Sequence, residues 1–164
     1  MSLVVGTDTY LSVTDADTYW SNRNNSVWSS SSTAEKEKAL REATQYLDGS
    51  YVFIGQQITT NVLAWPRHDA EVLNGNFAGI YYDSETIPPQ IKSSCAELAL
   101  DALSSRLQPS QKRGGAIKKE KVDVIEVEYL DFAPSETSYS FVTGILTPLL
   151  AGGGNSVVRK LVRT

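Results

Sequence analysis

Residues 88–107, PPQIKSSCAELALDALSSRL, constrain the fold more than any other stretch of the chain. Two adjacent prolines suit the first turn of a helix, where backbone amides lack intrahelical partners and a fixed φ is favourable. Apolar residues then recur at helical spacing and form one broad stripe, which Pro109 ends. Small residues within the stripe allow a second helix to approach closely. The chain is therefore expected to be mainly α-helical, with this segment as its core helix.

A first short helix is expected within residues 11–23. Ser12 can cap its first turn, because a serine hydroxyl accepts a hydrogen bond from a free backbone amide there. Apolar side chains ending at Trp20 then fall on one face. The serine-rich and asparagine-rich residues 24–33 read as a polar loop that carries Trp28.

A second helix has the clearest start signal in the sequence. Ser32 followed by Glu35 has the spacing of a capping box, in which each side chain binds a free backbone amide. Apolar residues recur at helical intervals as far as Leu47, and Gly49 marks the expected stop.

The long connection, residues 50–86, shows no helical period. A structureless loop of this length is unusual inside a compact domain. We therefore expect Phe53, Leu63 and Trp65 to tie it to the core, with a short turn or strand along the way.

The chain changes character after the core helix. Residues 122–130 have high β-propensity, and a slip in their alternation indicates a bulge or a strand covered on both faces. Such a strand needs a partner, either within this chain or from another subunit. Residues 140–151 are expected to form a last short helix that Pro148 can break.

These elements predict a small bundle of three to four helices with a strand or hairpin near residues 122–130. The expected helical domain covers residues 1–151, and glycines 152–154 begin a hinged C-terminal arm that covers residues 152–164. The residues expected in the structural core are Trp20, Leu47, Trp65, Leu98 and Leu103.

No catalytic or metal-binding arrangement stands out. Cys95 and His68 are the only cysteine and the only histidine, which leaves no plausible Cys/His zinc site. The sequence has no glycine-rich phosphate loop and no nucleophile elbow. We expect no enzymatic activity, no cofactor and no metal, with Cys95 as a small buried apolar residue and His68 on a surface loop. No apolar run approaches the length of a membrane span, and the N-terminus does not resemble a secretion signal.

Charge is unevenly distributed along the chain. The net charge is −4, yet residues 112–121, KRGGAIKKEK, carry five positive charges and one negative charge. The tail VVRKLVRT adds Arg159, Lys160 and Arg163. These basic segments suit either single-stranded DNA or acidic protein partners, but neither segment contains an aromatic residue for base stacking. A strand without an evident partner and an apolar, basic arm fit a subunit of a homomeric assembly better.

Several stretches carry a resemblance in the right order along most of the chain. YLSVTDADTYW, ALREATQYLD, LAWPRHDA, IPPQIKSSCAELAL and VVRKLVRT resemble the adaptor, or head-completion, proteins of tailed bacteriophages. Members of this group often carry the label DnaT-like single-stranded-DNA-binding protein. The sequence departs from the pattern at residues 71–85, which lengthen the stretch between the WPR and IP motifs.

The resemblance implies a structural adaptor of the head–tail connector. Such a protein forms a dodecameric ring beneath the portal protein at the capsid vertex, extends the DNA channel and docks the next stopper or tail-completion protein. It would be made in the host bacterial cytoplasm and reside in the virion, with double-stranded DNA passing through without specific readout and with no membrane contact. The alternative is a replication accessory protein that binds single-stranded DNA.

The resemblance also assigns candidate contact residues. The arm that would engage the portal contains Val157, Val158, Arg159, Lys160, Leu161, Val162 and Arg163. The candidate inter-subunit contacts are Arg67, Lys112, Arg113, Lys118, Lys119 and Lys121. Within LAWPRHDA, we expect Trp65 to pin the long connection onto the helical core and Pro66 to fix its exit direction. Arg67 is then expected to form a salt bridge within the subunit or across the ring, or else to be solvated.

Overall fold

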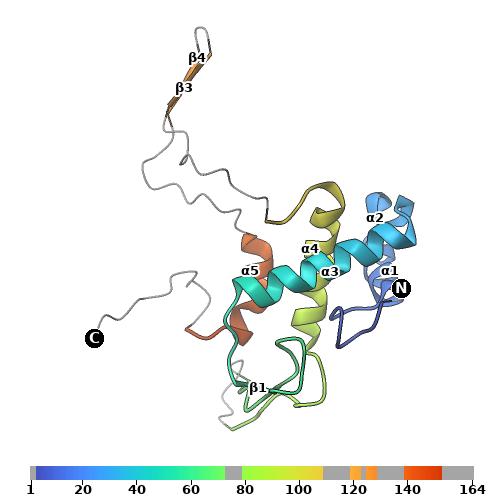
Figure 1. The fold of residues 1–164 in the computed structure, drawn as a ribbon, viewed down its shortest axis with the longest axis vertical. Helices are drawn as coiled ribbons and strands as arrows, with labels where there is room; N and C mark the ends of the chain where they lie inside the picture. Colours follow the sequence, from blue (N-terminus) through green and yellow to red (C-terminus); the bar gives the residue numbers. More distant parts are fainter. Residues whose placement is uncertain (1–2, 73–78, 109–118, 123–124, 129–138, 153–164) are drawn as a thin grey trace. The chain divides into compact units, whose positions relative to one another are not determined.

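The computed structural model describes residues 3–72, 79–108, 119–122, 125–128 and 139–152 (Figure 1). The chain divides into two compact units, one formed by residues 1–107 with 139–164 and the other by residues 108–138. Among the described residues, the first unit contains five α-helices, and the second contains a β-hairpin. The prediction of a mainly α-helical protein with a small β element is confirmed.

Two short helices form the N-terminal part of the first unit. Helix α1 covers Val13–Ser21, and the Ser12 hydroxyl accepts a hydrogen bond from the Asp15 amide at 3.0 Å, as the sequence predicts. Helix α2 covers Ser26–Ser30, where the sequence indicated only a polar loop. That expectation was wrong because Asn25 caps this turn by accepting a hydrogen bond from the Trp28 amide.

Helix α3 covers Thr33–Ser50 and begins with the predicted capping box. The Ser32 hydroxyl accepts from the Glu35 amide, and the Glu35 carboxylate accepts from the Ser32 amide at 2.8 Å. The helix runs through Gly49, which is therefore not the stop. It ends at Tyr51, whose extended backbone leaves the helix while its amide still donates to the Leu47 carbonyl oxygen.

Helix α4 covers Pro89–Ser104 and starts at the double proline as predicted. It makes its most extensive contact with α3 (Figure 1), and Cys95, Ala96 and Ala99 are fully buried. The prediction that small residues admit a close helix is thereby confirmed. The helix ends earlier than Pro109, because the chain turns away to bury Leu107, whose amide donates to Glu42 at 2.8 Å.

The connection between α3 and α4 is ordered where it is described. Strand β1, Gln56–Gln57, pairs antiparallel with strand β2, Arg67–His68. Gly55 precedes β1 with φ +74°, and a Cβ there would lie 2.5 Å from the His68 carbonyl oxygen. Only glycine fits this close approach between the two halves of the connection.

The C-terminal part of the first unit packs back onto the core. Helix α5 covers Ser140–Leu146, and a 3₁₀ turn, η1, follows at Thr147–Leu149, so the predicted break before Pro148 is confirmed. Helix α5 packs on α4, and a backbone hydrogen bond of 2.9 Å joins Ile54 to Leu149.

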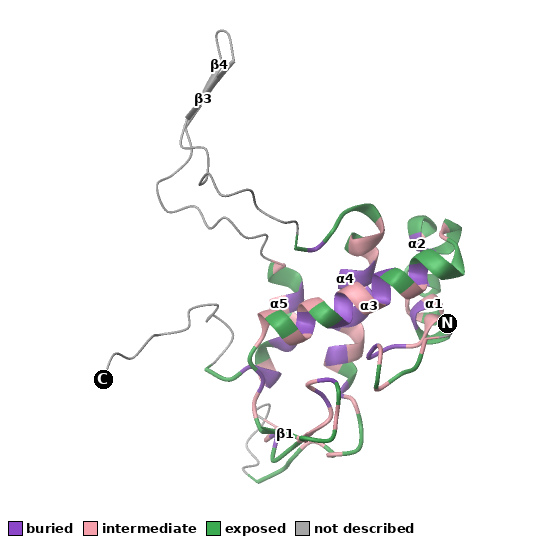
Figure 2. Ribbon diagram, viewed as in Figure 1, coloured by how far each residue is buried: buried purple, intermediate pink, exposed green. Residues whose placement is uncertain are grey.

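The buried residues form one apolar core at the junction of these helices (Figure 2). Of the five predicted core residues, Trp20, Leu47, Trp65 and Leu98 are buried. Leu103 is only partly buried, because it lies near the end of α4 where the helix reaches the surface.

The second unit contains strands β3, Lys119–Val122, and β4, Ile125–Glu128. They pair antiparallel with Lys119 opposite Glu128 and Val122 opposite Ile125. The partner that the sequence required for the strand near residues 122–130 therefore comes from the same chain. It is supplied by the end of the basic stretch.

Candidate functional site

The WPR segment anchors the long connection from inside the core. Trp65 is fully buried, and its ring meets those of Phe53 and Tyr82 edge to face, with centroids 5.8 Å and 6.1 Å away. Phe53 and Leu63 are buried as well. The prediction that these three residues tie down the connection is confirmed.

Arg67 donates hydrogen bonds to backbone carbonyl oxygens of the long connection and not to a carboxylate. Its Nε donates to the Ile54 carbonyl oxygen at 2.7 Å, and its two terminal nitrogens donate to Gly55 at 2.9 Å and Ala64 at 3.3 Å. Neither ion pair found among the described residues involves Arg67, so the expected salt bridge within the subunit is wrong. A contact of Arg67 across a ring stays a prediction.

A buried polar network joins the N-terminal loop, α3 and the WPR segment. The Tyr10 hydroxyl donates to Asp48 and accepts from the Trp65 amide at 3.2 Å. The other carboxylate oxygen of Asp48 accepts from the Ala64 amide at 3.1 Å. Burial raises the pKa of Asp48 above its usual value despite these hydrogen bonds, and burial also raises the pKa of Tyr10. The network has a structural role, since both oxygens are already engaged.

A second polar junction holds the first three helices together. Asp17 accepts hydrogen bonds from the Trp28 indole at 2.7 Å and from the Lys36 ammonium at 2.9 Å. Lys36 is itself buried and stands 5.6 Å from the centroid of the Trp28 ring. The sequence spacing of Asp17, Trp28 and Lys36 did not indicate this junction, because the three residues belong to different helices.

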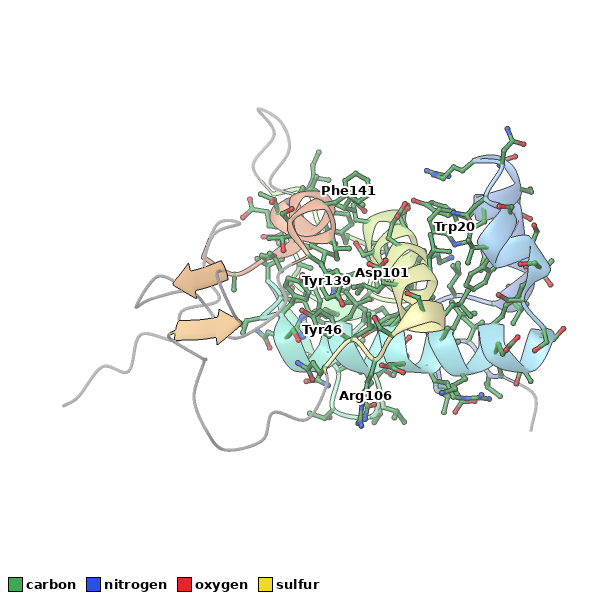
Figure 3. The ribbon with its side chains drawn as sticks, turned by 90° about the horizontal axis from the view of Figure 1, so that it is seen from above. Trp20, Tyr46, Asp101, Arg106, Tyr139 and Phe141 are labelled. Carbon is green, nitrogen blue, oxygen red and sulfur yellow. The ribbon has the colours of Figure 1, made fainter. Side chains whose placement is uncertain are left out.

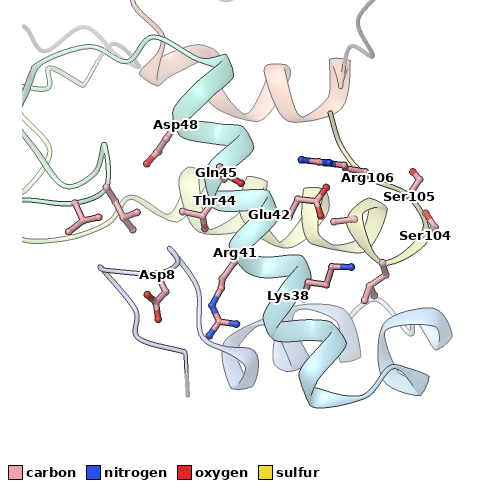
Figure 4. Close-up of a pocket in the computed structure, with 14 residues that line it drawn as sticks. Asp8, Lys38, Arg41, Glu42, Thr44, Gln45, Asp48, Ser104, Ser105 and Arg106 are labelled. Carbon is pink, nitrogen blue, oxygen red and sulfur yellow. The ribbon is translucent and has the colours of Figure 1, made fainter. Parts of the chain in front are cut away.

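An open groove of about 1010 Å³ runs along α3 (Figure 4). Helix α3 forms one side of the groove, and the end of α4 with Ser105 and Arg106 forms the other. Its charged side chains are balanced, three acidic and three basic: Asp8, Glu42, Asp48, Lys38, Arg41 and Arg106. Apolar residues including Val62 and Leu103 complete the lining. The groove therefore has neither the single charge sign of a phosphate site nor a nucleophile beside a base.

The described residues hold no group of three or more His, Cys, Asp or Glu side chains that could bind a metal. Cys95 is fully buried, and burial raises its pKa to about 11, which keeps the thiol protonated and unreactive. His68 is exposed on β2. No helix among the residues that the structure describes is long and apolar enough to span a membrane.

The described aromatic residues leave little surface for base stacking. All three tryptophans are buried, and only Tyr81 and Phe141 are prominently exposed, at 55% and 65%. Phe141 lies on α5, and Tyr46 and Tyr139 form an aromatic pair with ring centroids 5.2 Å apart (Figure 3). Residues 3–107 and 139–152 contain seven Lys and Arg but thirteen Asp and Glu, a net charge of −6. The helical unit is therefore poorly suited to hold phosphates.

The predicted contact residues are only partly placed. Lys119 and Lys121 lie in β3, and Arg67 lies in β2. The remaining inter-subunit candidates and the whole portal-binding arm lie outside the described residues: Lys112, Arg113, Lys118, Val157, Val158, Arg159, Lys160, Leu161, Val162 and Arg163. Arg67 therefore belongs to the helical unit, and Lys119 and Lys121 belong to the hairpin unit.

These features define a small, mainly α-helical protein that combines a helical unit with a β-hairpin. A family model described as "Putative DnaT-like ssDNA binding protein" matches residues 2–164, and the chain belongs to this family. No curated protein and no solved structure matches the chain significantly.

Proposed function

We propose that the protein is a structural adaptor in the head–tail connector of a tailed bacteriophage. Copies form a ring beneath the portal protein, extend the DNA channel and dock the next stopper or tail-completion protein. The observation that carries the proposal is the separation of charge along the chain. Residues 3–107 with 139–152 have a net charge of −6, whereas residues 112–121 and 159–163 are basic. The resemblance of the sequence motifs to phage adaptors supplies the ring, its twelve copies and its place in the virion.

The acidic helical unit suits a channel through which DNA must move. A protein that neutralises many phosphates with Lys and Arg gains affinity for DNA, because counterions are released on binding. A surface that is acidic overall makes few such contacts. The three tryptophans are buried and so offer no stacking platform to nucleic-acid bases.

The basic segments fit protein partners in this arrangement. Subunits of a closed ring meet head to tail, so a basic segment of one copy can face an acidic surface of the next. Within the arm, residues 155–164 combine four apolar residues with Arg159, Lys160 and Arg163. This composition is suited to binding along an acidic, partly apolar surface of the portal.

Single-stranded DNA binding is the second candidate, and the family description favours it. The positive charge for it would come from the same basic segments. The acidic helical unit and the scarcity of exposed aromatics count against it. In this alternative the protein acts as a replication accessory and is absent from finished particles.

Quantitative mass spectrometry of purified virions separates the two functions. The adaptor predicts equal molar amounts of this protein and the portal protein. Absence from virions, together with abundance in infected cells, would overturn the adaptor and favour the DNA-binding function.

A binding assay provides the complementary test. Fluorescence anisotropy with a labelled oligonucleotide at several salt concentrations measures both affinity and its salt dependence. The adaptor predicts weak binding at physiological salt, whereas a dedicated single-stranded-DNA-binding protein would bind in the submicromolar range with a steep salt slope.

A further inference from the structure

The β3–β4 hairpin forms a sheet of only two strands. Each strand is paired along one edge, and neither has a second neighbour among the residues that the structure describes. A two-stranded hairpin is marginally stable alone, and three or more strands are usually needed for independent stability. Unpaired strand edges also present backbone amide and carbonyl groups that can pair with another strand.

The two edges of this hairpin differ in charge. Strand β3, KEKV, contains Lys119 and Lys121 against one glutamate, whereas strand β4, IEVE, contains Glu126 and Glu128 and no cation. The register places Lys119 opposite Glu128 and Lys121 opposite Glu126. Opposite charges at facing positions stabilise an antiparallel pair, and like charges destabilise it.

We propose that the hairpins of adjacent copies pair edge to edge, with β4 of one copy beside β3 of the next. This inference rests on the proposed ring. Neighbouring copies in a ring of many subunits hold their hairpins in nearly the same orientation. Strand β4 of one copy therefore runs antiparallel to β3 of the next copy, as it does to β3 of its own chain. The same register then places lysines opposite glutamates at every junction, and the sheet continues from copy to copy.

The occupant of each edge is a second copy because the hairpin is complementary to itself in only one direction. Two-fold pairing of β3 with β3 about Glu120 would align lysines with lysines, and two-fold pairing of β4 with β4 about Val127 would align glutamates with glutamates. The charge pattern therefore favours a head-to-tail contact over a two-fold symmetric one. Head-to-tail contacts generate rings when the rotation closes.

Two opposite variants of the full chain test this pairing. One carries Lys119→Glu and Lys121→Glu, and the other carries Glu126→Lys and Glu128→Lys. Each variant has like charges within its own hairpin and at each junction with its own copies. We expect self-association of each to be at least roughly tenfold weaker than that of the unaltered chain, measured by sedimentation velocity.

Mixing the two variants isolates the contact between copies. In the mixture, β4 of either variant faces an oppositely charged β3 of the other, although both hairpins keep their internal repulsion. Association of the equimolar mixture is therefore expected to exceed that of either variant alone by at least roughly tenfold. Equal association of the mixture and the separate variants would overturn the proposal, because damage to the single hairpins cannot be repaired by mixing.

A charge-matched pair controls for general attraction between oppositely altered chains. Lys38→Glu with Lys92→Glu, mixed with Glu37→Lys with Glu85→Lys, changes net charge by the same amounts on the helical unit. Equal recovery by this pair would also overturn the hairpin contact. Quantitative mass spectrometry of virions tests the ring function separately. The mixing experiment measures association between hairpins whether or not a portal is present.

Discussion

Replacing Arg67 by alanine tests the main structural role found in the WPR segment. The guanidinium group holds the carbonyl oxygens of Ile54, Gly55 and Ala64 with three hydrogen bonds of 2.7–3.3 Å. These carbonyls belong to both halves of the connection between α3 and α4. Arg67→Ala removes all three bonds and leaves the two halves joined by the short β1–β2 ladder and the Trp65 anchor.

The expected loss of stability follows from the number and kind of these bonds. Hydrogen bonds from a charged donor contribute about 1.5–3 kcal/mol each when they are well shielded. Arg67 is half-buried, and water can replace part of the lost interaction. We therefore expect a decrease of about 2–3 kcal/mol in the free energy of unfolding, not the full sum. For a chain of this size that corresponds to a decrease of roughly 4–12 °C in Tm.

Urea denaturation followed by circular dichroism measures this change. Arg67→Lys keeps the charge but lacks the planar fork, so it should recover only a minor part of the lost stability. The exposed Arg106 provides a matched control, and Arg106→Ala should change the free energy of unfolding by less than about 0.5 kcal/mol. A similarly small effect of Arg67→Ala would refute the stabilising role of its three hydrogen bonds. Arg67 would then remain a candidate inter-subunit contact.

Three further outcomes follow from the described contacts. Ser32→Ala removes the capping box of α3 and should cost about 1 kcal/mol of unfolding free energy, measured by urea denaturation. Burial raises the pKa of Asp48 in the folded state, so the folded protein binds more protons than the unfolded chain between the two pKa values. The free energy of unfolding should therefore fall as pH rises from about 4 through the raised pKa. Asp48→Asn should flatten this part of a Tm-against-pH curve. Cys95, with a pKa of about 11 and no exposed surface, should resist Ellman's reagent in the native state and react fully in guanidinium chloride.

Helix starts and the core helix could be predicted because their signals are local. The capping box at Ser32 and the proline pair at Pro88 each act within a single turn. The apolar stripe of α4 follows from helical periodicity alone. The anchoring role of Trp65 could also be predicted, since a long connection in a compact domain needs a large apolar residue to hold it.

Features that depend on distant partners were beyond the reach of these patterns. Helix α2 is held by the Asp17 contact with Trp28, which spans two helices. The end of α4 depends on Glu42, which receives the Leu107 amide from 65 residues away. Arg67 was expected either to form a salt bridge or to be solvated, but it donates hydrogen bonds to three backbone carbonyl oxygens of the folded connection.

The two compact units allow stability and assembly to be separated in one experiment. Arg67 belongs to the helical unit, while Lys119 and Lys121 belong to the hairpin unit. Changes at independent sites usually add within about 0.3–0.5 kcal/mol. Combining Arg67→Ala with Lys119→Glu and Lys121→Glu should therefore lower unfolding free energy only as far as Arg67→Ala does, and should weaken association only as far as the hairpin changes do. Urea denaturation at low protein concentration and sedimentation velocity, applied to all three variants, measure the two effects separately. A coupling above about 1 kcal/mol in the free energy of association would show that Arg67 also takes part in the contact between copies, the role that the sequence first suggested for it.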